Sequence, residues 1–263
     1  MVMPALSLER RALRCAHGVM PEYLDRPGLP RIAYELRDGA GPTIVFLPGY
    51  GSDMSGSKAV ALDAWAEAEG RALLRLDYRG CGESEGVFGE ATLADWHDDA
   101  LDAIDHLTQG PLILIGSSMG GWLMLLIALE RSERVVGLVG IAAAPDFTEW
   151  GYDEVQRAAL ADDGLIAVEH PDYDTPEITT RAFWESGQAN LLLDAEIPID
   201  CPVRLLHGLE DSDVPPSITF RLGRALRSAN VQTLLVKDGE HRLSRPGDLG
   251  LLLTTVAALI ESL

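Results

Sequence analysis

Residues 111–121 read Pro-Leu-Ile-Leu-Ile-Gly-Ser-Ser-Met-Gly-Gly, and this stretch decides the fold that the sequence predicts. Leu112 to Ile115 form an apolar run as long as a short buried strand, and residues 116–120 match the pattern G-x-S-x-G. Apolar residues 122–126 then continue as a helix. A serine between such a strand and such a helix sits on a sharp, strained turn that exposes its hydroxyl. Ser118 is therefore the candidate nucleophile, although the pentapeptide alone is a weak signal, because glycine and serine are common in turns.

The composition restricts the class of protein. The chain has 263 residues, of which 47% are hydrophobic, which indicates a globular protein with enough residues for one large domain with a sizeable core or for two small ones. A net charge of −20 and a pI near 4.5 argue against binding to nucleic acid or to anionic membrane surfaces. The three cysteines lie far apart without a C-x-x-C pattern, which favours a reducing compartment and indicates neither a disulfide framework nor a zinc site.

The N-terminus gives an expectation about cellular location. Glu9, Arg10, Arg11 and Arg14 would interrupt the apolar core of a signal peptide. The longest apolar run, near Leu249 to Ile260, is too short to span a bilayer and predicts an amphipathic core helix. We therefore expect a cytoplasmic protein with no integral membrane segment, with the mitochondrial matrix as the less favoured alternative.

Short apolar runs alternate with helical patterns along the first 144 residues. Thr43–Leu47 and Ala72–Leu76 predict buried strands, and the alternating pattern of Arg31–Arg37 predicts an edge strand. This rhythm indicates an α/β fold with a mostly parallel central sheet and helices on both faces. In such sheets active sites form at the carboxyl ends of the strands. Glycine-rich loops lie at that edge after residues 47 and 76, and the Ser118 turn lies there too.

The rhythm breaks between residues 146 and 200, which we expect to form a short helical cap inserted into a single domain spanning residues 1–263. This segment holds two arginines and fourteen carboxylates. It also contains five aromatic residues, for which packing within the cap is favoured over lining an acyl or aryl pocket: Trp150, Tyr152, Tyr173, Phe183 and Trp184.

A histidine and a carboxylate complete the candidate site. His241 alone among six histidines lies in the loop after the last predicted strand, where a general base is needed to take the serine proton. The stretch His207 to Pro215 fits H-G-x-x-D-x-x-V-P, which places the acid at Asp211, whereas Asp213 would support the turn or cap the next helix. A buried carboxylate fixes the imidazole tautomer. A structural role is expected for His207.

An oxyanion needs two backbone N–H donors, and we expect these from Met119, after the nucleophile, and Tyr50, in the loop after Leu47. The Tyr50 side chain would either narrow the pocket or shield it. Residues 77–84 form a D-x-R-G-x-G-x-S loop, in which Arg79 and Glu83 are expected to form a local ion pair. Cys81 and Cys201 are expected to be small buried residues, not nucleophiles.

The order Ser…Asp…His belongs to the α/β-hydrolases. Residues 47–59, 116–125, 197–198 with 201–208, and 241–242 resemble, more specifically, the palmitoyl-protein thioesterases and acyl-glucuronide esterases of mitochondria, and the similarity covers roughly residues 26–262. The resemblance implies thioester or ester hydrolysis by Ser118, Asp211 and His241 without a cofactor or a metal ion.

The expected function is that of a serine hydrolase acting on a small-molecule ester, a thioester or an acyl-protein through an acyl-enzyme. Two alternatives remain: a cofactor-free perhydrolase, which needs the same triad, and a non-catalytic ligand-binding protein of the same fold. Dehalogenase and epoxide hydrolase activities are disfavoured, because their nucleophile is a carboxylate and residue 118 is serine.

Overall fold

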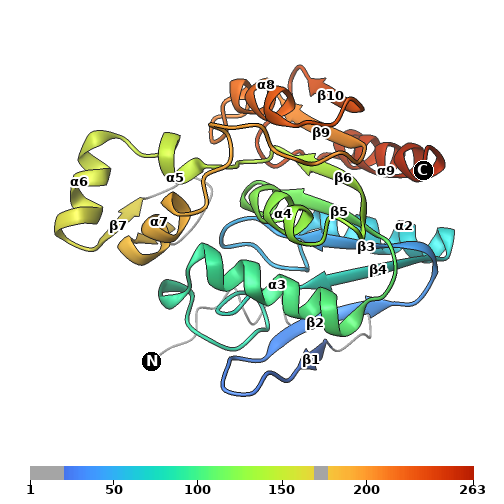
Figure 1. Ribbon diagram of the computed structural model, residues 1–263, viewed down its shortest axis with the longest axis horizontal. Helices are drawn as coiled ribbons and strands as arrows, with labels where there is room; N and C mark the ends of the chain where they lie inside the picture. The colour runs from blue at the N-terminus through green and yellow to red at the C-terminus, as the bar shows by residue number, and fades with distance from the viewer. Residues whose placement is uncertain (1–20, 169–176) are drawn as a thin grey trace.

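A computed structural model describes residues 21–168 and 177–263. Predictions that concern Glu9, the N-terminal arginines, Cys15 and Tyr173 fall outside these residues. An eight-stranded sheet forms the centre of the molecule (Figure 1). In spatial order its strands are β1 (Glu22–Leu24), β2 (Ile32–Arg37), β4 (Arg71–Leu76), β3 (Ala40–Leu47), β5 (Leu112–Ser117), β6 (Val135–Ile141), β9 (Val203–Gly208) and β10 (Val231–Val236).

The strand directions confirm a mostly parallel sheet. The pairs from β4 to β10 are all parallel, whereas β1 and β2 run antiparallel to their neighbours. The prediction that residues 31–37 form an edge strand is wrong, because β1 pairs with β2 on its outer side. The three residues of β1 are too few to give a sequence pattern of their own.

Helices cover both faces of this sheet, so the central strands are apolar on both sides. Figure 1 shows α3 (Leu93–Leu107), α4 (Met119–Glu130) and α8 (Pro216–Ala225) on one face, and α2 (Ser57–Glu69) and α9 (Pro246–Glu261) on the other. Successive residues of β3 alternate between the two hydrophobic cores, one on each face of the sheet. Val45 and Leu47 join the first core, and Ile44 and Phe46 join the second.

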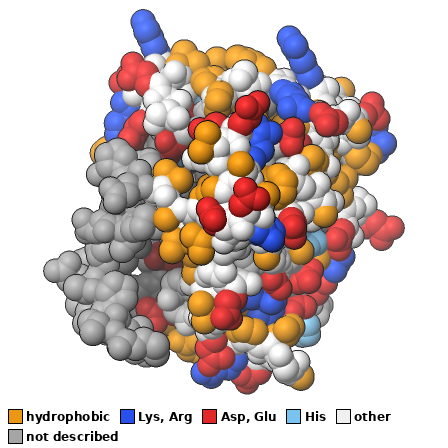
Figure 2. All heavy atoms as spheres, turned by 90° about the vertical axis from the view of Figure 1, so that its left-hand side faces the viewer, with side chains coloured by type: hydrophobic (Ala, Val, Ile, Leu, Met, Phe, Trp, Pro, Cys, Tyr) orange, Lys and Arg blue, Asp and Glu red, His pale blue; other side chains and the backbone are white. Residues whose placement is uncertain are grey.

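The segment between β6 and β9 leaves the main sheet. It contains α5 (Phe147–Trp150), α6 (Glu154–Asp162), α7 (Arg181–Gln188) and a separate antiparallel pair, β7 (Leu165–Val168) and β8 (Glu177–Thr180). Figure 1 shows α6 and β7 to one side of the main sheet, and Figure 2 shows carboxylates interspersed with hydrophobic side chains on that side. The small sheet was not predicted, because each of its strands has only four residues, too few for a clear sequence pattern.

Asp146 holds the two ends of this segment together. Its carboxylate is almost fully buried and accepts hydrogen bonds from the backbone N–H groups of Leu192 and Leu193, at 2.7–3.0 Å. Burial raises the pKa of Asp146, and the two N–H groups act against that rise. The aspartate has a φ of 59°, a left-handed conformation that Asp tolerates better than most residues.

Candidate active site

Ser118 lies on a turn that only flanking glycines permit. It follows β5 and precedes α4, with φ 53° and ψ −122°, a strained conformation for a residue with a side chain. A Cβ on Gly116 would lie 2.3 Å from the Gly120 carbonyl oxygen, and a Cβ on Gly120 would lie 2.1 Å from that of Leu47. Both glycines of the G-x-S-x-G pattern are therefore required by contact with backbone.

His241 lies within hydrogen-bond distance of this serine. Its Nε2 is 3.1 Å from the Ser118 Oγ, and its Nδ1 is 2.9 Å and 3.1 Å from the two carboxylate oxygens of Asp211. The carboxylate can only accept from Nδ1–H, so the neutral ring presents Nε2 to the serine hydroxyl as an acceptor. The structure thus brings together three residues that lie far apart in the sequence.

Asp211 is held as an ionised group. Burial would raise its pKa, but the contact with His241 and the N–H groups of Asp213 and Val214, at 2.9 Å and 2.8 Å, lower it overall. The Asp211 side chain is fully buried, whereas that of Asp213 is 38% exposed and lies 4.0 Å from Nε2, the other ring nitrogen. The geometry favours Asp211, as the motif spacing did.

His207 stabilises the loop that carries Asp211 through hydrogen bonds on both sides of its ring. Its Nε2–H donates to the Val214 carbonyl oxygen at 2.8 Å, and its Nδ1 accepts from the Thr219 hydroxyl at 2.6 Å. Burial lowers the pKa of His207, which favours the neutral ring. This agrees with the expected structural role and leaves His241 as the histidine that faces Ser118.

Met119 and Tyr50 flank the serine. Met119 is the first residue of α4, so its N–H has no acceptor one turn back within the helix. The Tyr50 loop (residues 48–56) passes close by, since a Cβ on Gly49 would lie 3.3 Å from the Ser118 Cβ. Met119 and the Tyr50 loop, at Gly49, therefore lie beside the serine.

Two charged residues at the end of β4 fix the Tyr50 loop. The Met54 N–H donates to the Asp77 carboxylate at 2.6 Å, and the Met54 carbonyl oxygen accepts from the Arg75 guanidinium at 2.8 Å. All three residues are buried. Sequence reasoning missed this clamp, because nothing in the local pattern says which backbone groups a buried charge will meet.

The Tyr50 ring packs at the centre of an aromatic cluster. Four aromatic rings pack against it in T-shaped geometry, with their centroids 5.0–6.1 Å from the centroid of the Tyr50 ring: Phe88, Trp96, Phe147 and Phe183. Its hydroxyl donates to the Ile178 carbonyl oxygen of β8 at 2.6 Å. The side chain thus links the loop beside Ser118 to the segment between β6 and β9.

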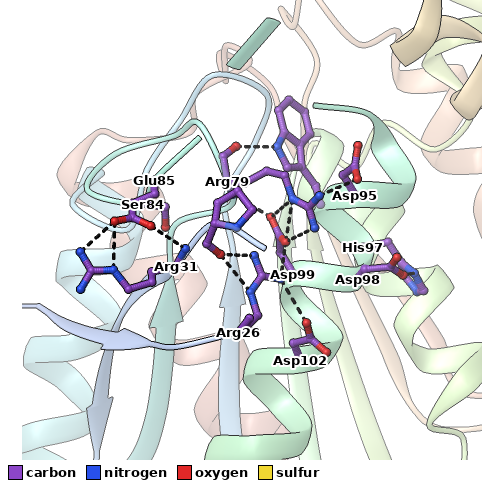
Figure 3. A network of polar contacts seen from close by, with 12 residues as sticks. Arg26, Arg31, Arg79, Ser84, Glu85, Asp95, His97, Asp98, Asp99 and Asp102 are labelled. Carbon is purple, nitrogen blue, oxygen red and sulfur yellow. Dashed lines mark hydrogen bonds and ion pairs between the residues drawn. The ribbon is translucent and has the colours of Figure 1, made fainter. Parts of the chain in front are cut away.

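Arg79 does not form the ion pair that the sequence predicted. Its guanidinium pairs with Asp95 and Asp99 on α3, each at 2.6 Å, and Arg26 reaches the same Asp99 (Figure 3). The Arg79 carbonyl oxygen also accepts from the Trp96 indole at 3.0 Å. The network therefore orients one ring of the aromatic cluster, and the local pairing with Glu83 was wrong because the partners lie on a helix.

The two cysteines within the described residues, Cys81 and Cys201, have no features of a nucleophile. Cys81 is buried, and burial together with Asp77 raises the pKa of its thiol well above the ordinary value. Cys201 is only partly buried, and burial raises its pKa to about 11. Within the described residues, no group of three or more metal-binding side chains lies close enough together to hold a metal ion. None of the helices in that part of the chain is long and apolar enough to cross a bilayer.

Comparison with known proteins agrees with this fold. A model of the α/β-hydrolase fold family matches residues 42–165. The mitochondrial palmitoyl-protein thioesterase ABHD10 of Bos taurus is 37% identical over 253 residues, and its human counterpart is 35% identical over 264; each alignment covers 95% of this chain and 83% of the relative. The solved structure of mouse alpha/beta hydrolase domain-containing protein 10 has a TM-score of 0.87 at 35% identity and covers 93% of this chain and 99% of that one.

The chain therefore belongs to the α/β-hydrolase family. Its relatives carry the name palmitoyl-protein thioesterase, and the protein is accordingly an enzyme that hydrolyses esters or thioesters. The same relatives are named as mitochondrial, which contradicts the cytoplasmic location that we expected from the sequence. That expectation rested in part on the charged residues near the N-terminus, which argue against a signal peptide but do not distinguish the cytoplasm from mitochondria, because mitochondrial targeting segments are themselves rich in arginine.

Proposed function

We propose that this protein is a serine hydrolase that cleaves acyl thioesters or esters through a covalent acyl-enzyme at Ser118. The observation that carries the proposal is the hydrogen-bonded line from Asp211 through His241 to the Ser118 hydroxyl, with distances of 2.9 Å and 3.1 Å. Acyl-proteins are the favoured substrate class, because the relatives are named for acting on palmitoyl-proteins.

Acylation follows from this line. The Ser118 Oγ attacks the carbonyl carbon while His241 Nε2 takes its proton, which gives a tetrahedral oxyanion and an imidazolium. The nearby Asp211 carboxylate stabilises that imidazolium. The N–H groups of Met119 and Tyr50 stabilise the oxyanion. The C–S or C–O bond then breaks, and His241 returns the proton to the leaving thiolate or alkoxide.

Deacylation repeats these steps with water. His241 takes a proton from water as the oxygen attacks the acyl carbon, and a second oxyanion forms in the same place. Breaking the bond to Oγ releases the carboxylic acid, and the proton on His241 returns to Ser118. The protein groups then have their starting protonation states, so the cycle consumes only substrate and water.

A fluorophosphonate probe and a panel of p-nitrophenyl esters and acyl-CoA thioesters test the proposal. The wild type should label and turn over acyl substrates, and Ser118→Ala should do neither. The matched control is Ser117→Ala, which changes the neighbouring serine of the same pentapeptide and should still label. If a folded wild type neither labels nor hydrolyses any acyl substrate, the assignment fails and a ligand-binding role becomes the better account.

A further inference from the structure

The chain contains only two lysines, Lys58 and Lys237, and the first of them connects two loops of the site. Lys58 is the second residue of α2, the helix that follows the Tyr50 loop. Its Nζ donates a hydrogen bond of 2.6 Å to the Arg242 carbonyl oxygen. Arg242 directly follows His241. Lys58 therefore joins the loop beside Ser118 to the loop that carries the histidine.

The position of Lys58 is unfavourable for a lysine. The first turn of a helix is its positive end, and the first turn of α2 contains no acidic residue that would offset the charge. Burial, followed by the Arg242 charge, lowers the pKa of Lys58 to about 8, although Glu240 and Asp248 act in the opposite direction. A lysine at this position therefore does not stabilise the helix. Its favourable interaction is the hydrogen bond to the Arg242 carbonyl oxygen.

The carbonyl that Lys58 binds belongs to a strained peptide. Leu243, on the other side of that peptide bond, has a φ of 43°, which is costly for a leucine. Its side chain is buried in the hydrophobic core to which α2 and α9 also contribute, and this packing keeps the residue in its strained conformation. A donor on the Arg242 carbonyl oxygen fixes the orientation of this peptide plane, and the backbone of His241 is one residue away.

We propose that Lys58 is a positioning residue, which keeps the His241 ring in line with Ser118 by holding the Arg242 carbonyl oxygen. The proposal rests on the serine hydrolase function proposed above. Lys58 need not touch the substrate. Without its N–H donors the peptide after Arg242 relies on the longer hydrogen bond from the Leu243 N–H to the Glu240 carbonyl oxygen, at 3.3 Å, and the imidazole spends less time within reach of the serine hydroxyl.

The test compares three variants with the wild type in steady-state hydrolysis of a p-nitrophenyl ester. Lys58→Met keeps the length of the side chain and removes the donors, Lys58→Arg restores a donor, and Lys237→Met is the matched control. We expect Lys58→Met to lower kcat about 10- to 100-fold with KM changed less than threefold, Lys58→Arg to recover most of the loss, and Lys237→Met to match the wild type.

Other outcomes would contradict the positioning role of Lys58 or the function on which it rests. Activity of Lys58→Met within twofold of the wild type overturns the positioning role, as does a loss that Lys58→Arg does not reverse. A loss of kcat that parallels a fall in melting temperature, or failure of the methionine variant to fold, also overturns it, because Lys58 would then act on the whole fold. If the wild type itself is inactive on every acyl substrate, the proposed function fails, independently of Lys58.

Discussion

Replacing Asp211 by asparagine should disable the base while leaving the fold intact, and the hydrogen bonds around the carboxylate explain why. Oδ1 accepts the N–H groups of Asp213 and Val214, so the oxygen of the new carboxamide must take that position. The NH2 group then faces His241 Nδ1 in place of Oδ2, which lies 2.9 Å away in the wild type. Because a donor now faces Nδ1, the neutral ring must carry its proton on Nε2.

With its proton on Nε2, the ring presents an N–H donor to Ser118. It then has no lone pair on that nitrogen to accept the serine proton. A wrong tautomer of this kind lowers kcat by about 10³- to 10⁴-fold, or roughly 4–5.5 kcal/mol at about 1.4 kcal/mol per factor of ten. The melting temperature should change little, since the two backbone hydrogen bonds to Oδ1 survive. The assay is ester hydrolysis at neutral pH together with thermal unfolding followed by circular dichroism.

The matched control is Asp213→Asn, two residues away. The Asp213 carboxylate is partly exposed and lies 4.0 Å from Nε2, so we expect kcat within about threefold of the wild type. Equal losses in the two variants, or a loss below tenfold in Asp211→Asn with the fold preserved, would refute the assignment of the acid.

Three further predictions concern packing, the Tyr50 ring and pH. Gly120→Ala should destabilise the fold by roughly 3 kcal/mol or more, because its Cβ would lie 2.1 Å from the Leu47 carbonyl oxygen; a melting temperature near that of the wild type would contradict this. Tyr50→Ala removes the ring from the aromatic cluster but keeps the backbone N–H, so it should shift the preference among p-nitrophenyl esters towards longer acyl chains, whereas Tyr50→Phe should not; identical chain-length profiles would contradict it. The pKa of Lys58 is about 8 in the folded state and about 10.4 in an unfolded chain, so between these values the unfolded state binds more protons and stability rises with pH. The free energy of unfolding of the wild type minus that of Lys58→Met should therefore increase from pH 8 to pH 10, by at most about 1.4 kcal/mol per unit, and a flat difference in urea titrations would contradict the lowered pKa.

The parallel sheet could be predicted because its signals are local. Strands β3, β4 and β5 are short apolar runs followed by glycine-bearing loops, and the strand, serine turn and helix around Ser118 lie within a few residues of one another. The spacing in residues 207–215 likewise favoured Asp211 over Asp213 without a structure, and the position after the last strand was enough to single out His241.

Contacts between distant segments could not be predicted. Arg79 was expected to pair within its own loop, but its partners lie on α3 and are separated from it by a 3-10 helix and a turn. The bond from the Tyr50 hydroxyl to Ile178 likewise joins two segments far apart in the sequence and depends on where the segment after β6 lies. The pattern of apolar and polar residues predicts which face of a helix or strand is buried. It does not predict which distant side chain will contact that face.

The central claim is that Ser118 is the nucleophile and that it is acylated during turnover. The most direct test is intact-mass spectrometry of the wild type, Ser118→Ala and Ser117→Ala after reaction with a fluorophosphonate, followed by peptide mapping. We predict one adduct per chain in the wild type and in Ser117→Ala, located on Ser118, and none in Ser118→Ala. An adduct on any other residue, or labelling that persists in Ser118→Ala, would contradict the account.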